Sequence, residues 1–177
     1  MARVIISEAE IQARVVELAD QIGRDYAGVE RVVLVGVLKG AFIFLADLAR
    51  ALSTRLPHIV DFMAVSSYGK SATSSGAVRL MLDLREPIEG EHVILVEDIV
   101  DTGHTLDYLY RTLQGRNPAS LRTCTLSLKQ RDQLEVPIHY LGFTIPDVWV
   151  VGYGLDYADL HRTLPFVAEL KPEVYQE

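Results

Sequence analysis

The sequence is poor in cysteine and in long apolar runs. Its 177 residues include one cysteine, Cys124, so a disulfide framework within the chain is excluded. No apolar stretch approaches the roughly 20 residues that a transmembrane helix requires. The first residues, MARVIISEAE, lack the apolar core of a signal peptide. These absences predict a cytoplasmic protein that does not associate with membranes.

Positive charge is scarce as well. The chain has 17 Lys and Arg residues against 24 Asp and Glu residues, so its net charge is −7, and it contains no basic block. Because a nucleic-acid-binding surface normally needs a basic patch, this composition argues against a nucleic-acid partner. It does not exclude an anionic small molecule, since backbone amides, a helix N-terminus and a bound metal hold phosphates without net positive charge.

Three common ligand motifs are missing too. The sequence has no G-x-x-x-x-G-K-[ST], no G-x-G-x-x-G after a predicted strand and no Cys/His spacing typical of zinc. These absences argue against a P-loop NTPase, a Rossmann dinucleotide site and a zinc site, respectively.

Apolar runs alternate with amphipathic segments along the whole chain, without repeats, linkers or low-complexity stretches, which predicts one domain over residues 1–177. The β-branched runs 31–37 and 92–98 are typical of strands buried on both faces of a parallel sheet. The alternation predicts an α/β fold with a mostly parallel central sheet flanked by helices. Further strands are predicted at 58–68, 77–84, 121–128 and 148–154. A helix is predicted at 106–113, and another, with Leu45, Leu48, Ala49 and Leu52 on one face, is expected to end before Pro57.

The first helix has the clearest boundaries. Ser7 and Glu10 form an S-x-x-E capping box, which predicts that the helix begins at Ser7. Gly23 or Gly28 is expected to end it. The residues of its apolar face are Ile11, Val15, Leu18 and Ile22.

The stretch VILVEDIVDTGHT, residues 93–105, combines several features of a ligand site. An apolar strand ends in Glu97 and Asp98, and Asp101 follows just before a tight turn and a helix. Ligands of open α/β sheets bind outside the carboxyl ends of the strands, and amides at a helix N-terminus suit a phosphate. Carboxylates beside a phosphate cradle predict a site for ribose 5-phosphate; the alternative is a plain turn with Asp101 as a helix cap. The turn consists of Thr102, Gly103, His104 and Thr105.

This string of an apolar strand, E-D, two apolar residues and D-T-G-x-T resembles the phosphoribosyl-pyrophosphate motif of type I phosphoribosyltransferases. The resemblance implies that family's fold, with a small hood region and a flexible active-site loop, and Mg²⁺ as the cofactor. It assigns Asp101 the role of catalytic base toward purine N7. The ribose 5-phosphate would contact Glu97, Asp98, Asp101, Thr102, Gly103, His104 and Thr105.

Two further segments resemble hypoxanthine-guanine phosphoribosyltransferases. In GVLKGA (36–41), the resemblance implies that Lys39 and Gly40 bind pyrophosphate and that the Leu38–Lys39 peptide is often cis. In SSYG (66–69), it implies that Ser67 and Tyr68 close over the site and exclude water. From the residues alone, a simple strand-to-helix connection is the better interpretation of 36–41, and composition does not separate a closing loop from a hairpin loop at 66–69.

Lys129 in SLKQR and Trp149 and Val150 in IPDVWVVGYGLDYADLHR match the base-binding positions of the same family. Lys129 would bind the purine C6 oxygen, and because lysine only donates hydrogen bonds, it would select an oxo group over an amino group. Trp149 would stack on the base, and the backbone of Val150 would read its edge. The alternatives are a solvent-exposed lysine and a core tryptophan.

The last segment also carries Asp156 and Arg162. The resemblance implies that Asp156 holds magnesium, with Glu97 and Asp98 as further candidate ligands, and that Arg162 lies near pyrophosphate. Asp156 could otherwise be a turn residue. Two positions depart from the family pattern: a histidine fills the variable position of D-T-G-x-T, and a tryptophan replaces the more usual phenylalanine or tyrosine.

The likeness runs from the first helix to about Leu170. It implies a purine salvage enzyme that transfers the phosphoribosyl group from phosphoribosyl pyrophosphate to hypoxanthine or guanine, as a homodimer or homotetramer. A phosphoribosyltransferase for another base and a phosphoribosyl-pyrophosphate-binding regulator of a nucleic acid remain alternatives, the second disfavoured by the acidic composition. The residues do not rank hypoxanthine, guanine and xanthine.

Overall fold

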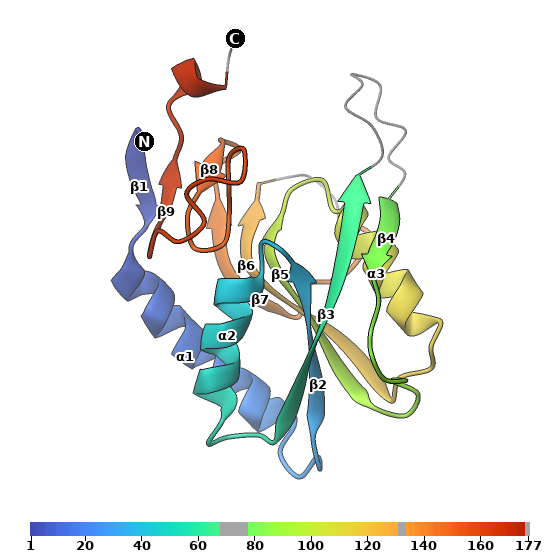
Figure 1. Ribbon diagram of the computed structural model, residues 1–177. Coiled ribbons are helices and arrows are strands. Elements are labelled where there is room, and N and C mark those ends of the chain that lie inside the picture. The colour runs from blue at the N-terminus through green and yellow to red at the C-terminus, as the bar shows by residue number, and fades with distance from the viewer. Residues whose placement is uncertain (68–77, 131–133, 176–177) are drawn as a thin grey trace.

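The computed structural model describes residues 1–67, 78–130 and 134–175. Its centre is a six-stranded sheet with the order β4-β3-β2-β5-β6-β7, in which every neighbouring pair is parallel except β3 and β4 (Figure 1). The predicted mostly parallel sheet is confirmed. Its strands are β2 (Val32–Leu38), β3 (His58–Ser67), β4 (Val78–Leu82), β5 (His92–Val100), β6 (Ser120–Lys129) and β7 (Tyr140–Ile145).

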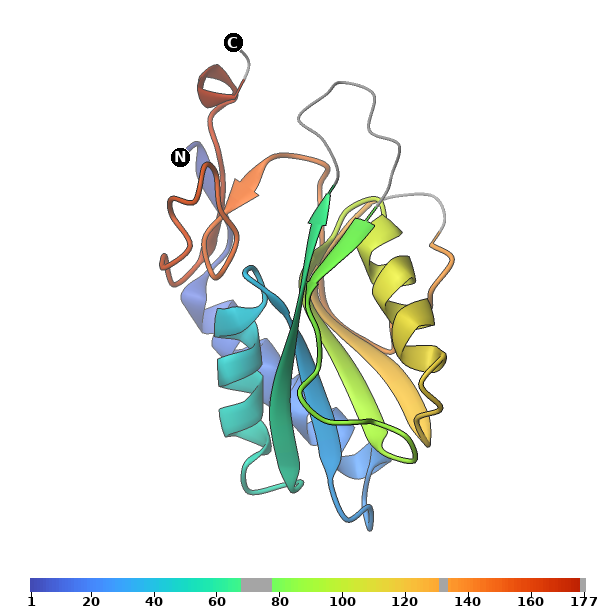
Figure 2. The same ribbon diagram turned by 45° about the vertical axis from the view of Figure 1, so that its right-hand side comes forward.

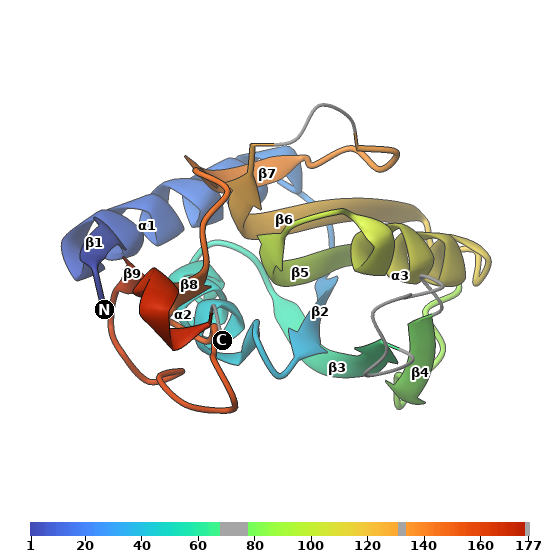
Figure 3. The same cartoon turned by 90° about the horizontal axis from the view of Figure 1, so that it is seen from above.

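The central strands have apolar side chains on both faces because helices cover both faces. Helices α1 (Glu8–Asp25) and α2 (Phe42–Leu52) pack on one face, and α3 (His104–Gln114) packs on the other (Figure 3). In β2, Val32 and Leu34 belong to the core under α1 and α2. The residues between and after them, such as Val33 and Val35, belong to the core under α3. This alternation explains the continuous apolar run in the sequence.

Helix α1 begins as predicted but ends later than Gly23. The Ser7 hydroxyl accepts the Glu10 N–H, and the Glu10 carboxylate accepts the Ser7 N–H at 2.8 Å. The helix continues through Gly23 to Asp25, and Gly28, with φ of +83°, follows three residues later. A glycine inside a helix costs about 1 kcal/mol, which burial of the apolar face outweighs.

A second, smaller sheet forms a hood over α1 and α2, close to both chain termini (Figures 1 and 2). It contains β1 (Arg3–Ile6), β9 (Val167–Glu169) and β8 (Val150–Val151) in that antiparallel order. A 3₁₀ turn, η1 (Pro172–Val174), follows β9. The predicted hood region is therefore confirmed, and it stands beside the carboxyl ends of the central strands.

Segment 148–154 was predicted as a core strand, and that prediction is wrong. Only Val150–Val151 is a strand, and it belongs to the hood. The chain then turns through residues 152–154, whose φ angles of +98°, +51° and +104° end any strand. The outer central strand is instead β7, where Gly142 weakens the strand pattern. A Cβ on Gly142 would lie 2.2 Å from the Leu126 carbonyl oxygen, so close packing requires the glycine.

Some predictions lie outside the described residues. These are the mobile loop at 69–76, Tyr68 and the side chain of Ser67, which ends β3. Within the three described ranges, no helix is both long and apolar enough to span a membrane.

Candidate active site

A cavity of about 310 Å³ opens at the carboxyl ends of β2, β3 and β5. It is lined by every residue predicted to contact ribose 5-phosphate except His104, together with Leu38 and Gly40 of the β2–α2 connection. His104 instead lines neighbouring hollows together with Asp107. The cavity thus forms where the sequence motif predicted a ligand, at the edge where parallel strands present their ends.

The turn before α3 leaves backbone amides available to the cavity. Gly103 is the N-cap, with φ of +84°, and no side chain caps the helix. The first amides of a helix have no intrahelical acceptor, so those following Gly103 can bind an anion. The alternative role of Asp101 as the helix cap is therefore wrong, since Gly103 holds that position.

Glu97 and Asp98 are buried carboxyl groups at the end of β5, with exposed fractions of 5% and 9%. Two effects raise the pKa of Glu97 well above its usual value: burial, which is the larger, and the negative charge of the neighbouring Asp98. Burial also raises the pKa of Asp98 to about 6, although backbone N–H groups and Arg162 lower it. In the described part of the chain, Glu97 Oε1 has no hydrogen-bond partner. A buried acceptor beside an open cavity suits a hydroxyl donor from a ligand.

The β2–α2 connection is held tightly between β5 and the hood. The Leu38–Lys39 peptide is cis, as the family resemblance implied. A Cβ on Gly40 would lie 1.8 Å from Asp98 Oδ2, and a Cβ on Gly154 would lie 1.9 Å from the Gly40 carbonyl oxygen. Only glycine fits at either position, so the backbone of this loop is placed directly against the carboxylate.

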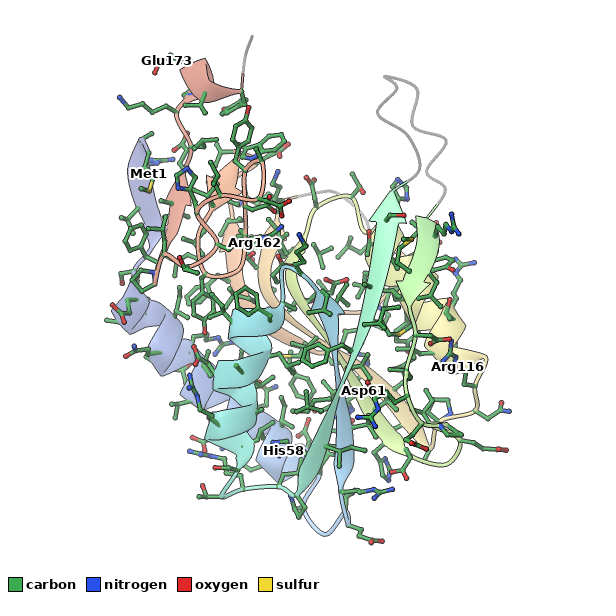
Figure 4. All side chains as sticks on the ribbon, viewed as in Figure 1. Met1, His58, Asp61, Arg116, Arg162 and Glu173 are labelled. Carbon is green, nitrogen blue, oxygen red and sulfur yellow. The ribbon has the colours of Figure 1, made fainter. Side chains whose placement is uncertain are left out.

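The two cations predicted to bind pyrophosphate meet at one carboxylate. Lys39 Nζ lies 3.0 Å from Asp159 Oδ1, and Arg162 Nη2 lies 2.9 Å from the same oxygen. Arg162 also contacts Asp156 Oδ1 at 2.8 Å and donates to the Gly154 carbonyl at 2.8 Å. Arg162 therefore lies between the hood and the loop after β2 (Figure 4). Sequence analysis missed Asp159, whose one local signal is its place between Asp156 and Arg162.

Lys129 lies next to the predicted catalytic base. Its side chain is only 12% exposed, so the alternative of a solvent-exposed lysine is wrong. Its Nζ lies 3.0 Å from Asp101 Oδ2 and 3.3 Å from Asp147 Oδ1. Asp147 was missed by sequence analysis. The lysine side chain carries only hydrogen-bond donors, so both carboxylates accept from the same ammonium group.

Trp149 is 46% exposed, so it is not a core residue. Its ring contacts two tyrosine rings of the hood region, those of Tyr157 and Tyr175. Val150 follows it in β8 and is buried, so only its backbone groups could meet a ligand. The indole therefore retains open surface, as a base-stacking ring requires.

The carboxylate of Asp156 suits a metal ion that binds together with a phosphate substrate. Across the described residues, no three His, Cys, Asp or Glu side chains form a metal-binding group. Asp156 accepts Arg162 at one oxygen and the Asp159 N–H, at 2.7 Å, at the other. Each carboxylate oxygen keeps a lone pair for a metal-bound water. Mg²⁺ typically takes one or two carboxylates, several waters and substrate phosphates, and this arrangement fits that pattern.

Comparison with known proteins agrees with this geometry. The family model described as "Phosphoribosyl transferase domain" matches residues 7–158. The chain belongs to this phosphoribosyltransferase family. A hypoxanthine-guanine phosphoribosyltransferase of Dictyostelium discoideum is 49% identical to this phosphoribosyltransferase, over 98% of each chain. One of Mycobacterium tuberculosis H37Rv is also 49% identical, over 98% of this chain and 88% of its own.

A solved structure shares the fold. The hypoxanthine phosphoribosyltransferase of Trypanosoma cruzi in complex with the product IMP has 48% sequence identity and a TM-score of 0.89, and the match covers 98% of this chain and 96% of that one. The predicted family and type I phosphoribosyltransferase fold are therefore confirmed.

Proposed function

We propose that this phosphoribosyltransferase joins N9 of hypoxanthine or guanine to C1 of the ribose of phosphoribosyl pyrophosphate, forming IMP or GMP and releasing pyrophosphate. The observation that carries the proposal is the contact between Asp101 and Lys129, 3.0 Å apart at the cavity rim. This contact joins a proton acceptor to a donor that recognises a C6 oxygen. A 6-oxopurine presents both matching groups, N7 and O6, on one edge.

The ribose 5-phosphate occupies the cavity at the end of β5. Its phosphate accepts hydrogen bonds from the backbone amides at the start of α3, where no side chain caps the helix. Its hydroxyls donate hydrogen bonds to the buried carboxyl oxygens of Glu97 and Asp98. These carboxyl groups stand beside the anomeric carbon, so in ionised form they stabilise the positive charge that grows there as the pyrophosphate departs. Burial strengthens that effect because water does not screen it.

The pyrophosphate leaves between the β2–α2 loop and the hood. The loop backbone at Gly40 approaches it directly, and Lys39 and Arg162 offset its charge. When bound, Mg²⁺ would neutralise the leaving group further, and Asp156 would help to hold it.

The base lies between Lys129 and Trp149. Lys129 donates to O6, Trp149 stacks on the ring, and Asp101 accepts the N7 proton while N9 attacks C1 of the ribose. Fixing the base and the ribose in this geometry supplies much of the acceleration. The same residues disfavour adenine, because its 6-amino group is a donor that faces another donor.

The test is turnover with a panel of bases. The protein, phosphoribosyl pyrophosphate and Mg²⁺ are mixed with hypoxanthine, guanine, xanthine or adenine, and nucleotide formation is followed by absorbance. We expect rapid turnover of hypoxanthine or guanine, its loss with EDTA, and none with adenine. Binding of phosphoribosyl pyrophosphate without turnover of any of these purines would contradict the proposal. We expect the active species to be a homodimer or homotetramer, which sedimentation would measure.

A further inference from the structure

Trp149 is the one tryptophan in the chain, and two tyrosine rings contact its indole ring. The Tyr175 ring stacks on it, with centroids 5.5 Å apart and planes at 26°. The Tyr157 ring meets it edge-on, at 5.8 Å and 84°. The indole nevertheless stays 46% exposed, so Tyr175 covers one face and leaves open surface for a ligand.

The last described residues are anchored to this cluster through the backbone as well. The Leu170 N–H donates to the Trp149 carbonyl at 2.8 Å. The Tyr157 hydroxyl donates to the Val174 carbonyl at 2.8 Å, directly before Tyr175. Between them lies η1, which Figure 1 shows above the hood, next to the C-terminus. Tyr157 thus contacts the indole with its ring and the C-terminal backbone with its hydroxyl.

These contacts favour one orientation of the indole before any base arrives. An exposed tryptophan without neighbours would sample several rotamers, and a base would have to order it on binding. Offset-stacked and edge-on aromatic pairs stabilise a ring beyond the effect of burial alone. An ordered ring therefore binds a flat ligand more tightly than a mobile one does.

We propose that Tyr175 is a positioning residue of the base site, which backs the Trp149 ring so that its opposite face meets the purine. Tyr157 holds the C-terminal segment in the position from which Tyr175 can do this. The proposal rests on the proposed function, because it takes Trp149 as the base-stacking residue. It predicts an effect on base and nucleotide binding and little effect on the chemical step or on phosphoribosyl pyrophosphate.

The single tryptophan gives a direct measurement, since fluorescence emission reports this ring alone. The probe is IMP, titrated into wild type, Tyr175→Ala and the matched control Tyr175→Phe, which keeps the aromatic ring. In Tyr175→Ala we expect emission shifted to longer wavelength before any addition, and a dissociation constant for IMP raised about three- to tenfold, the size of one aromatic pair. Tyr175→Phe should resemble wild type.

Steady-state kinetics supply the second readout. In Tyr175→Ala, the KM for hypoxanthine should rise by a similar factor, while kcat and the KM for phosphoribosyl pyrophosphate stay within about twofold. Tyr157→Phe, which loses only the hydroxyl bond to Val174, should change the same constants in the same direction by less.

Three outcomes would overturn the inference. Tighter IMP binding by Tyr175→Ala would mean that Tyr175 occupies the face that the base uses. Unchanged binding would mean that it has no role there, and a fall in kcat alone would place its effect elsewhere. Failure of the proposed function looks different, because wild type itself would then neither turn over hypoxanthine nor bind IMP.

Discussion

The two halves of the site are built in different ways. The cavity half, residues 97–105, is one continuous piece of chain that runs from the end of β5 into α3. The rim half consists of side chains that come from the loop after β2, the end of β6 and the segments around β8. These rim residues are Lys39, Lys129, Asp147, Trp149, Asp156, Asp159 and Arg162.

Burial also differs between the deepest carboxyl groups of the cavity half and the most exposed charged residues of the rim half. Glu97 and Asp98 in the cavity half are 5% and 9% exposed, whereas the side chains of Lys39 and Asp159 at the rim are 68% and 67% exposed. Electrostatic contacts are stronger where water is excluded and weaker where it is present. We therefore expect changes in the cavity half to alter rates strongly and changes at the exposed rim to alter affinities modestly.

The largest effect should come from Asp101→Asn. An amide of the same shape cannot accept the N7 proton, so kcat should fall by about 10²- to 10⁴-fold while the KM for phosphoribosyl pyrophosphate changes little. The matched control is Asp107→Asn, one turn into α3, where the carboxylate pairs with Arg111. Near-normal turnover of Asp101→Asn would remove the base assignment and weaken the contrast.

Gly40→Ala should come next. The added methyl would meet the Asp98 carboxylate, so the β2–α2 loop must move, and a shift of about 1 Å in an active site can cost about 100-fold in kcat/KM. Gly115→Ala is the control, because a Cβ there would lie an ordinary 3.5 Å from its nearest neighbour, the Arg111 carbonyl oxygen. Equal activities of the two variants would show that the loop is not fixed against Asp98.

The buried carboxyl groups should also make the ligand-free protein pH-sensitive. Because burial raises the pKa of Asp98 from 3.8 to about 6, the folded state favours the protonated form. The stabilisation is present below about pH 4 and is lost as the pH rises toward 6, so wild type should lose about 2 kcal/mol between pH 4.5 and 7 from this group.

Urea unfolding of wild type and Asp98→Asn at both pH values isolates that contribution. The free energy of unfolding of the variant, relative to wild type, should be about 2 kcal/mol higher at pH 7 than at pH 4.5. Parallel pH dependence of the two proteins would mean that Asp98 titrates normally and that the cavity half is more hydrated than its burial indicates.

The smallest effect should come from Asp159→Asn at the rim. Asp159 pairs with Lys39 and Arg162, and both residues lower its pKa, the hydrogen bond from Arg162 being the largest single cause. Pyrophosphate must compete with this carboxylate for both cations. The variant should therefore bind pyrophosphate about two- to fourfold more tightly, as product inhibition would measure, because exposed ion pairs are weak. Asp20→Asn, which removes the exposed partner of Arg55, is the control. Weaker inhibition would mean that Asp159 orients the two cations instead.

The cavity half could be predicted from sequence because its residues are neighbours in the chain. A buried strand, paired carboxylates, a glycine turn and a helix follow in order, so local rules were enough to place Glu97 and Gly103. Asp147 and Asp159 were missed because their role depends on contacts with other elements of the fold. Asp147 contacts Lys129 at the end of β6, and Asp159 contacts Lys39, which lies 120 residues away in the chain. The hood strands β1 and β9 were missed and β8 was assigned to the wrong sheet, since strands of two to four residues carry no readable period.

The contact between Asp101 and Lys129 joins the two halves, and a double-mutant cycle tests it most directly. The kcat/KM for hypoxanthine is measured for wild type, Asp101→Asn, Lys129→Ala and the double variant, with adenine as the comparison base. We predict a coupling of about 1–3 kcal/mol between the two positions, and a loss of discrimination against adenine in Lys129→Ala. Additive effects with unchanged base selectivity would contradict the account, because Asp101 and Lys129 would then not act on the same base.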